Sequence, residues 1–395
     1  MSVEPSDDAG DGTERGGRIT TWAGTMAGHR APSGVVVAHR SGPVAAVGCR
    51  RVDRQAREEA EAASLSEGAT RAEGAGHRAR PEAPDPLRTC FERDRDRILH
   101  STPFRRLAGK TQVFVFPNDH QRTRLTHALE VAQVATAVAR ATGLNVALVE
   151  AIALGHDCGH GPGGHASEDA FAPFLAEGYD HAIWGADVVL TPLNLCAETL
   201  DGIRHHSWSL PAPVTPEGLV VSWADRCAYC AHDLEDAAST GVVDAADLPT
   251  EVADVIGTRR SVQLRSFVNA LVDTILETGT VGMRPAEAEA LAGLRRFNYE
   301  RIYTRPESVA QARAVVAVLR ALVDFFVADP QGLPAPDPTR WPDGDPVAGG
   351  SADAVVRRAV AHVAGMTDRY AFATAVSQLG WDPRRLPRGV DTGLS

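Results

Sequence analysis

The sequence predicts a mainly helical protein, and three observations support this fold class. From about residue 124 onwards, apolar residues recur at steps of three, four and seven, which is the spacing of one face of an α-helix. Glycines interrupt these patterns at Gly143 and over 159–164, as expected at helix ends. No series of alternating strands and no internal repeat is found. With 395 residues, 44% of them hydrophobic, the chain can form a substantial core.

The first 85 residues differ in composition from the rest. They are rich in Gly, Ala, Arg, Glu, Ser and Pro, and apolar residues occur only in short stretches such as 35–37 and 44–47. Such a segment buries too little apolar surface to offset its ordering entropy. We therefore expect 1–85 to be a disordered extension, either a flexible tail or the product of a translation start placed too far upstream.

The helical patterns divide the remaining chain into three parts. Residues 86–328 form the main domain, 329–350 a Pro/Gly-rich loop, and 351–395 a C-terminal helical segment. The apolar residues over 146–156 are almost continuous, so this helix is expected to be central and buried. We expect helices over the following ranges: 124–142, 146–156, 166–177, 180–190, 217–239, 252–278, 285–297, 307–328 and 351–379.

Charge and cysteine content narrow the class of protein. The formal net charge of −11 repels polyanions, so a phosphate-bearing substrate requires a bound cation or a local arginine cluster. The six cysteines follow no disulfide framework, and the single C-x-x-C, Cys227 and Cys230, has no second pair to complete a zinc site. The acidic N-terminus and the lack of an apolar run of about 18 residues predict a cytoplasmic protein without a membrane span.

The most informative stretch is 154–165, where an apolar helix ends in an aspartate and several histidines. An ionised Asp157 beside apolar residues is costly to bury unless a cation pairs with it. A polar helix end, with histidines bonded to loop carbonyls, is the alternative interpretation. The clustering of three histidines with this aspartate favours a metal: His156, His160 and His165.

Two neighbouring helices supply further candidate ligands. His127 lies one turn into its helix, and Asp225 interrupts an apolar pattern within 217–239. With His156 and Asp157 they give two nitrogen and two oxygen ligands, a set suited to Mn, Mg or Fe, with Zn as a further option. A divalent metal acidifies water and neutralises phosphate charge, so both requirements of phosphate ester hydrolysis are met.

The order His, His-Asp, Asp resembles the HD phosphohydrolase superfamily. Several blocks also resemble its deoxyguanosinetriphosphatase-like branch: 88–101, 104–107, 110–114, 122–127, 193–195, 199–203 and 232–236. The similarity spans 88–328. It implies an all-α, HD-domain fold with a metal site in the helical core and a C-terminal helical extension.

The resemblance further implies a homo-oligomeric enzyme that hydrolyses deoxynucleoside triphosphates to deoxynucleoside and tripolyphosphate. The implied metal ligands are His127, His156, Asp157 and Asp225. The implied catalytic residues are His165, Glu168 and His181. The implied substrate-binding residues are His160 at a phosphate, and Tyr229 and Asp233 near the sugar. Independently of the family, the spacing of four and eight residues after Asp225 places the last two on roughly one helix face with it.

Basic residues near these motifs have competing interpretations. Arg122 and Arg124 lie within one turn of His127, which favours phosphate binding. Residues 93, 95 and 97 are arginines that alternate with aspartates, so a solvated ion-pair face and a phosphate clamp both remain open. Lys110 lies in a Gly-Lys-Thr sequence, but the glycine that a Walker motif needs is absent.

Three positions depart from the family pattern. Gly163 stands where the family usually has Phe, and Ala182 and Trp184 stand where it has Asn and Gln, so base selection is open. One alternative function is another HD reaction, such as nucleoside monophosphate dephosphorylation. The other is a catalytically weak protein that binds nucleotide or nucleic acid, and single-stranded DNA or a nucleotide effector is a possible further ligand of either kind of protein.

Overall fold

The computed structural model describes residues 12–31, 33–39, 48–335 and 351–388. The chain divides into two compact units, 1–51 and 52–395, which are described separately. The first contains helix α1 (Gly12–Thr25) and an antiparallel ribbon of β1 (His29–Arg30) and β2 (Val36–Val37). Regular structure is therefore present in part of the segment that was expected to be disordered, while 1–11, 32 and 40–47 lie outside the described residues.

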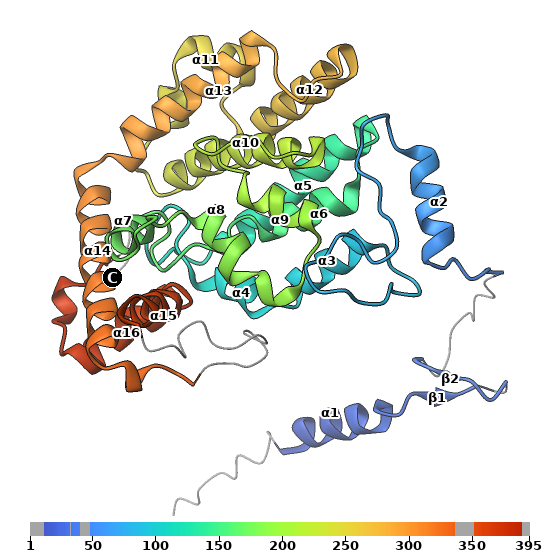
Figure 1. Ribbon diagram of the computed structural model, residues 1–395, viewed down its shortest axis with the longest axis horizontal. Coiled ribbons are helices and arrows are strands. Elements are labelled where there is room, and N and C mark those ends of the chain that lie inside the picture. Colours follow the sequence, from blue (N-terminus) through green and yellow to red (C-terminus); the bar gives the residue numbers. More distant parts are fainter. Residues whose placement is uncertain (1–11, 32, 40–47, 336–350, 389–395) are drawn as a thin grey trace, which may run out of the picture. The chain divides into compact units, whose positions relative to one another are not determined.

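The second unit is helical (Figure 1), which confirms the predicted all-α fold class. Its α-helices are α2 (Arg54–Ser64), α3 (Cys90–Leu99), α4 (Thr102–Arg106), α5 (Arg124–Thr142), α6 (Val146–Gly155), α7 (Ala166–Phe171), α8 (His181–Trp184), α9 (Ala197–Arg204), α10 (Pro216–Ser239), α11 (Thr250–Ile256), α12 (Arg260–Thr278), α13 (Pro285–Asn298), α14 (Pro306–Ala328), α15 (Ala352–Ala364) and α16 (Asp368–Leu379). None of the helices in the described ranges has the length and apolar character of a bilayer span.

Helix α6 lies at the centre of the largest apolar cluster, as its sequence predicts. Asn145 caps its start by accepting a hydrogen bond from the amide of Leu148 at 3.2 Å, and every residue from Leu148 to Gly155 except Glu150 is buried. Helices α3, α5, α9 and α10 surround it. Because α6 is buried along its length, the residues that follow its last turn lie inside the protein.

Two further apolar clusters form the walls around this centre. Helices α14, α15 and α16 pack with α7 through residues such as Phe171, Leu319 and Phe372. Helices α10, α11, α12 and α13 pack together on another side, as Figure 1 shows. The C-terminal helical segment is thus part of the main unit. The predicted loop falls partly on 336–350, which lies outside the described residues.

The structure breaks several helices that the periodicity alone joins. The expected helix 252–278 is divided at Gly257, which has a φ of 74°, a value that favours glycine. The expected helix 351–379 is divided between Ala364 and Asp368. The expected helices 166–177 and 180–190 are short α-helices, each followed by a tighter or wider helical turn.

Residues 52–80 differ from the expectation of a disordered extension over 1–85. Helix α2 forms there, and Ala69 and Ala72 are buried in the main core. The side chain of Arg78, 1% exposed, donates to the fully buried carboxylate of Asp94 at 2.6 Å. Composition pointed to disorder because this segment is poor in apolar residues, yet buried polar contacts anchor it to the helical unit.

Candidate active site and metal centre

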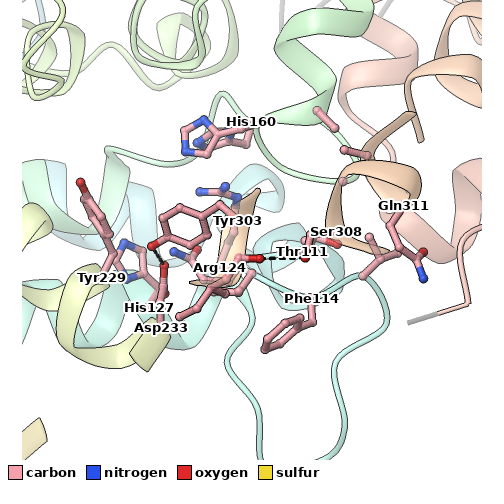
Figure 2. A pocket seen from close by; sticks show the side chains of 18 of the residues that line it. Thr111, Phe114, Arg124, His127, His160, Tyr229, Asp233, Tyr303, Ser308 and Gln311 are labelled. Carbon is pink, nitrogen blue, oxygen red and sulfur yellow. Dashed lines mark hydrogen bonds between the residues drawn. The ribbon is translucent and has the colours of Figure 1, made fainter. Parts of the chain in front are cut away.

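A cavity of about 1060 Å³ lies where the glycine-rich loop meets α5, α10, α13 and α14. Nine of the twelve site residues predicted from sequence line it: Arg124, His127, Asp157, His160, His165, His181, Asp225, Tyr229 and Asp233. His156 and Glu168 contact these residues without being part of the lining. Figure 2 shows that the labelled side chains come from several separate elements and surround one space.

The four predicted metal ligands converge from three core helices. His127 comes from α5, His156 and Asp157 follow α6, and Asp225 lies in the middle of α10. The Nε2 atom of His127 is 3.0 Å from Asp225 Oδ1 and 3.9 Å from Asp157 Oδ2. The Nε2 atom of His156 is 3.5 Å from Asp157 Oδ1 and 3.6 Å from Asp225 Oδ1. Two imidazoles and two carboxylates therefore share one small volume.

The hydrogen bonding of His156 shows that this group of side chains fits a cation. Its Nδ1 donates to the carbonyl of Ala153 at 2.7 Å, so in the neutral ring the lone pair is on Nε2. This buried Nε2 has no hydrogen-bond partner and points toward two carboxylates. A lone pair that faces anionic oxygens is unfavourable unless a positive charge lies between them. Burial lowers the pKa of His156, but Asp157 and Asp225 raise it to about 9, so the site requires a positive charge at Nε2, which a divalent metal can supply in place of a proton. Nitrogen and oxygen donors in this arrangement suit a divalent metal.

Both carboxylates of this group are held in the ionised state. Burial alone would raise the pKa of Asp157, but Arg124, His156 and His160 hold it well below its usual value. Burial likewise raises the pKa of Asp225, and the hydrogen bond from His127 and the nearby ring of His156 more than offset that effect. The centre therefore keeps the anionic charge that a metal requires.

The predicted catalytic residues form a second group beside the first. Glu168 Oε1 is 3.1 Å from His165 Nδ1 and 2.7 Å from His181 Nδ1. The ring of His160 stacks on that of His181 with 3.7 Å between centroids, and its Nε2 is 3.2 Å from Asp157 Oδ1. Although burial raises the pKa of Glu168, hydrogen bonds from the two histidines lower it below its usual value. Glu168 is thus an ionised acceptor adjoining the metal centre.

His206 is a member of this group that the sequence analysis missed. Its Nδ1 lies 2.8 Å from the carbonyl of Ile203, which only accepts, so Nδ1 carries a proton. Burial lowers the pKa of His206 to about 3, so the ring is neutral and its Nε2 accepts from His181 Nε2 at 3.2 Å. The adjacent histidines His205 and His206 can be seen in the sequence. They follow the end of α9, however, and beyond a helix the residue spacing does not predict which way a side chain points.

The structure separates the two arginines that the sequence treated alike. Arg124 lines the cavity and donates to Asp157 Oδ2 at 2.9 Å, while its buried Nε and Nη2 atoms have no partner. Arg122 does not reach the site, because its guanidinium pairs with three carboxylates: Glu130, Glu235 and Asp236. The arginines at 93, 95 and 97 also pair with carboxylates, which favours the ion-pair face over the phosphate clamp.

The part of the cavity that follows Asp225 along α10 carries hydroxyl groups and an acid with a raised pKa. Tyr229 accepts a hydrogen bond from Arg295 Nε at 2.9 Å, and Asp233 accepts one from the hydroxyl of Tyr303. Burial raises the pKa of Asp233 to about 7, and its second oxygen has no partner. Sequence reasoning missed Arg295 and Tyr303, since both lie more than 60 residues from the residues they contact.

The departures at 163, 182 and 184 have different structural consequences. Gly163 has a φ of 73°, and a Cβ there would lie 2.4 Å from Cγ1 of Val315 in α14, so α14 occupies the space of a side chain at this position. Trp184 is buried against Tyr179 in the cluster formed with α14 to α16 and does not line the cavity. Ala182 is fully buried.

Two other sequence features are structural. The ammonium group of Lys110 is buried and donates to the carbonyls of His160 and Ala364, so it fixes the loop and binds no nucleotide phosphate. Cys227 and Cys230 are fully buried in an apolar cluster, and burial raises the pKa of both thiols. Among the described residues, neither belongs to a group of potential metal ligands.

The comparisons with known proteins agree with this geometry. The HD domain family matches residues 124–230, and the phosphohydrolase-associated domain family matches 281–376. A deoxyguanosinetriphosphate triphosphohydrolase-like protein of Caldanaerobacter subterraneus is 38% identical over 328 residues, covering 81% of this chain and 93% of the relative. Proteins of the same name from Desulfatibacillum aliphaticivorans and Paracoccus denitrificans are 40% and 33% identical, over 63% and 76% of this chain and 77% and 96% of those relatives. The chain therefore belongs to the deoxyguanosinetriphosphate triphosphohydrolase-like family of HD phosphohydrolases.

Proposed function

We propose that the protein hydrolyses deoxynucleoside triphosphates, with dGTP as the type substrate, to deoxynucleoside and tripolyphosphate. The observation that carries this proposal is the order of groups along one cavity. His127, Asp157 and Asp225 lie beside Arg124, two of whose nitrogens have no partner. Tyr229 and Asp233 also line the cavity and come after Asp225 on the same helix, α10. This order fits a phosphate chain at one end and a sugar at the other.

The residues that would hold the metal are His127, His156, Asp157 and Asp225, and their nitrogen and oxygen atoms favour Mn, Mg or Fe over Zn. When bound, such an ion supplies an acidified water and neutralises phosphate charge. Arg124 adds to this neutralisation from the protein itself, because its Nε and Nη2 atoms are buried without a partner. Charge-assisted hydrogen bonds from a guanidinium are well suited to phosphate oxygens.

Glu168, His165 and His181 would manage protons in this scheme. Ionised Glu168 accepts from the Nδ1 atoms of both histidines, which fixes how each ring points. The Nε2 of His181 donates to His206, so only the Nε2 of His165, a cavity-lining residue, is left to act on substrate. We assign His165 as the general acid. In this role its ring is protonated at both nitrogens, so that Nδ1–H donates to Glu168 while the Nε2 proton passes to the departing 5′-oxygen.

Tyr229 and Asp233 would bind the sugar on the leaving side. The unpartnered oxygen of Asp233 is an acceptor suited to the 3′-hydroxyl. With the sugar held there and phosphates at Arg124, the α-phosphorus is the atom placed beside the metal ligands. Proximity of that kind favours attack by water at this phosphorus over attack at the terminal one.

The resemblance also leads us to propose a homo-oligomeric, cytoplasmic protein that single-stranded DNA or a nucleotide effector can bind. These proposals rest on the family alone. They do not affect the chemistry assigned to the cavity.

The test is product analysis with the metal-loaded protein and each of the four deoxynucleoside triphosphates, resolved by ion exchange. Deoxynucleoside and tripolyphosphate are expected as the products. Orthophosphate with a deoxynucleoside diphosphate would contradict the proposed direction of the substrate. Hydrolysis of deoxynucleoside monophosphates alone would favour the monophosphatase alternative, and retention of DNA without nucleotide turnover would favour a binding protein.

A further inference from the structure

Trp208 lies on the loop between α9 and α10 and lines the cavity, although it is 43% exposed. Its indole Nε1 donates to the carbonyl of Ser222 at 3.2 Å, and Trp223 packs against its edge with 4.6 Å between ring centroids. These two contacts fix the plane of the indole. A large aromatic ring held in one orientation at a cavity wall offers a flat surface for stacking.

The group that occupies this surface is the guanidinium of Arg226. Its central carbon is 3.5 Å from the centroid of the Trp208 ring, and Arg226 also lines the cavity. Within the described residues no ion pair between a carboxylate and Arg226 is found, and the buried Nε of Arg226 has no hydrogen-bond partner. It differs in this respect from Arg122, which pairs with three carboxylates, and from Arg124, which pairs with Asp157.

Stacking on an aromatic ring and pairing with a carboxylate differ in whether the charge and the N–H donors of a guanidinium remain available. A carboxylate partner uses the N–H groups at the edge and cancels the charge. An aromatic face attracts the cation through its quadrupole and leaves the edge free to donate. The indole therefore orients Arg226 while keeping both its positive charge and its in-plane N–H donors available to an anion.

We propose that Trp208 is a positioning residue that holds Arg226 as a ligand for the polyphosphate part of the substrate. This inference rests on the proposed function, since that function supplies the tripolyphosphate group. It assigns Trp208 no direct contact with the base. The stack acts on how tightly a polyphosphate is held.

The experiment measures binding of inorganic tripolyphosphate to the full-length, metal-loaded protein by calorimetry. Trp208→Ala is expected to weaken binding by about threefold to thirtyfold, the range of a stacked cation. Trp208→Phe restores part of the affinity, because a smaller aromatic face remains. Arg226→Ala weakens binding at least as much as Trp208→Ala. The double variant should match Arg226→Ala, because the indole acts through that arginine.

Trp381→Ala is the matched control. Its ring also has an arginine over it, with Cζ of Arg385 5.4 Å from the centroid, and neither residue lines the cavity. Tripolyphosphate affinity should be unchanged in this variant. A thermal melt of each variant verifies that it folds. Trp208→Ala is expected to fold, because the side chain of Trp208 is partly exposed.

Three results would overturn the inference. They are unchanged tripolyphosphate binding in Trp208→Ala, additive losses in the double variant, and a loss of deoxynucleoside binding without a loss of tripolyphosphate binding. The last result would mean that the indole stacks on the base. Because binding of tripolyphosphate requires no turnover, a failure of the proposed reaction would show separately in the product assay.

Discussion

The metal-ligand end of the cavity and a second wall, formed by the 111–115 segment and the glycine-rich loop, are built in different ways. His127, His156, Asp157 and Asp225 are carried by helices α5, α6 and α10, which share one apolar cluster. In the second wall, hydrogen bonds to Asp368 hold Thr111 and Gly163 in place. The first end takes its geometry from helix packing, whereas the second depends on contacts between residues far apart in sequence.

Asp368 shows how the second kind of contact works. From the start of α16 its buried carboxylate accepts from the amide and hydroxyl of Thr111 and from the amide of Gly163 at 2.8 Å. Thr111 and Gly163 both line the cavity. The phosphohydrolase-associated region therefore shapes the site from more than 200 residues away, and variants at the two ends should behave differently.

The largest effect is expected at the metal end. Asp157→Asn should lose bound metal and all measurable turnover, because it removes an ionised ligand from the centre. Glu168→Gln should retain the metal and lose about 10²- to 10⁴-fold in turnover, the range for a proton-handling group. Elemental analysis and turnover on the same samples test both. Metal retained in Asp157→Asn and absent from Glu168→Gln would reverse the two assignments.

A smaller effect on turnover is expected from substitution of Arg124, and its neighbour Arg122 provides the comparison. Arg124→Gln should lower kcat/KM by about 10²- to 10³-fold, as for loss of a preorganised donor. Arg122→Gln should leave KM near that of the wild type and instead lower the melting temperature, because it leaves the buried Asp236 without its cation, whereas Glu130 and Glu235 keep Arg260. A raised KM in Arg122→Gln would show that this residue reaches the substrate.

The second wall should tolerate change better. Asp368→Asn loses an acceptor for Thr111, and the resulting shift of the wall should lower turnover by about tenfold to a hundredfold while metal content is unchanged. The matched control is Asp353→Asn, an exposed aspartate in the first turn of the adjacent helix α15. Equal turnover in the two variants would mean that α16 has no role in shaping the site.

The smallest effect on turnover concerns the N-terminal region. Removal of 1–51, a separate compact unit, should change neither turnover nor the melting temperature. Arg78→Gln, in the segment that follows, should lower the free energy of unfolding by about 3–5 kcal/mol, because it leaves the buried Asp94 unpaired. Denaturant unfolding measures both. Equal destabilisation by the truncation would show that 1–51 also supports the core.

The contrast explains which parts of the site could be predicted from sequence. His127, Asp157 and Asp225 interrupt apolar helical patterns, so their burial, and hence their need for a cation, is visible in the sequence. The contacts of His206, Tyr303 and Arg295 depend on how remote helices and loops pack. Arg122 and Arg124 have the same sequence context, and only the positions of the neighbouring carboxylates distinguish them.

The fold follows the same division. Periodicity predicted α5, α6, α10, α13 and α14 to within a few residues, because their apolar stripes are long. It missed α2, α3 and α9, which are short and largely polar. Two contacts that anchor 52–80 also have no local signal in the sequence. Arg78 pairs with Asp94, 16 residues away, and Thr70 donates to Glu217, 147 residues away. Neither contact produces a periodic pattern of residues.

The most direct test of the central claim, that water attacks the α-phosphorus, is hydrolysis in H₂¹⁸O followed by mass spectrometry of both products. The account predicts the label in a terminal phosphate of tripolyphosphate and none in the deoxynucleoside, and Glu168→Gln serves as the control for enzymatic turnover. Label in the 5′-hydroxyl of the deoxynucleoside, or in released orthophosphate, would contradict it. Either result would mean that the cavity holds the substrate in another orientation.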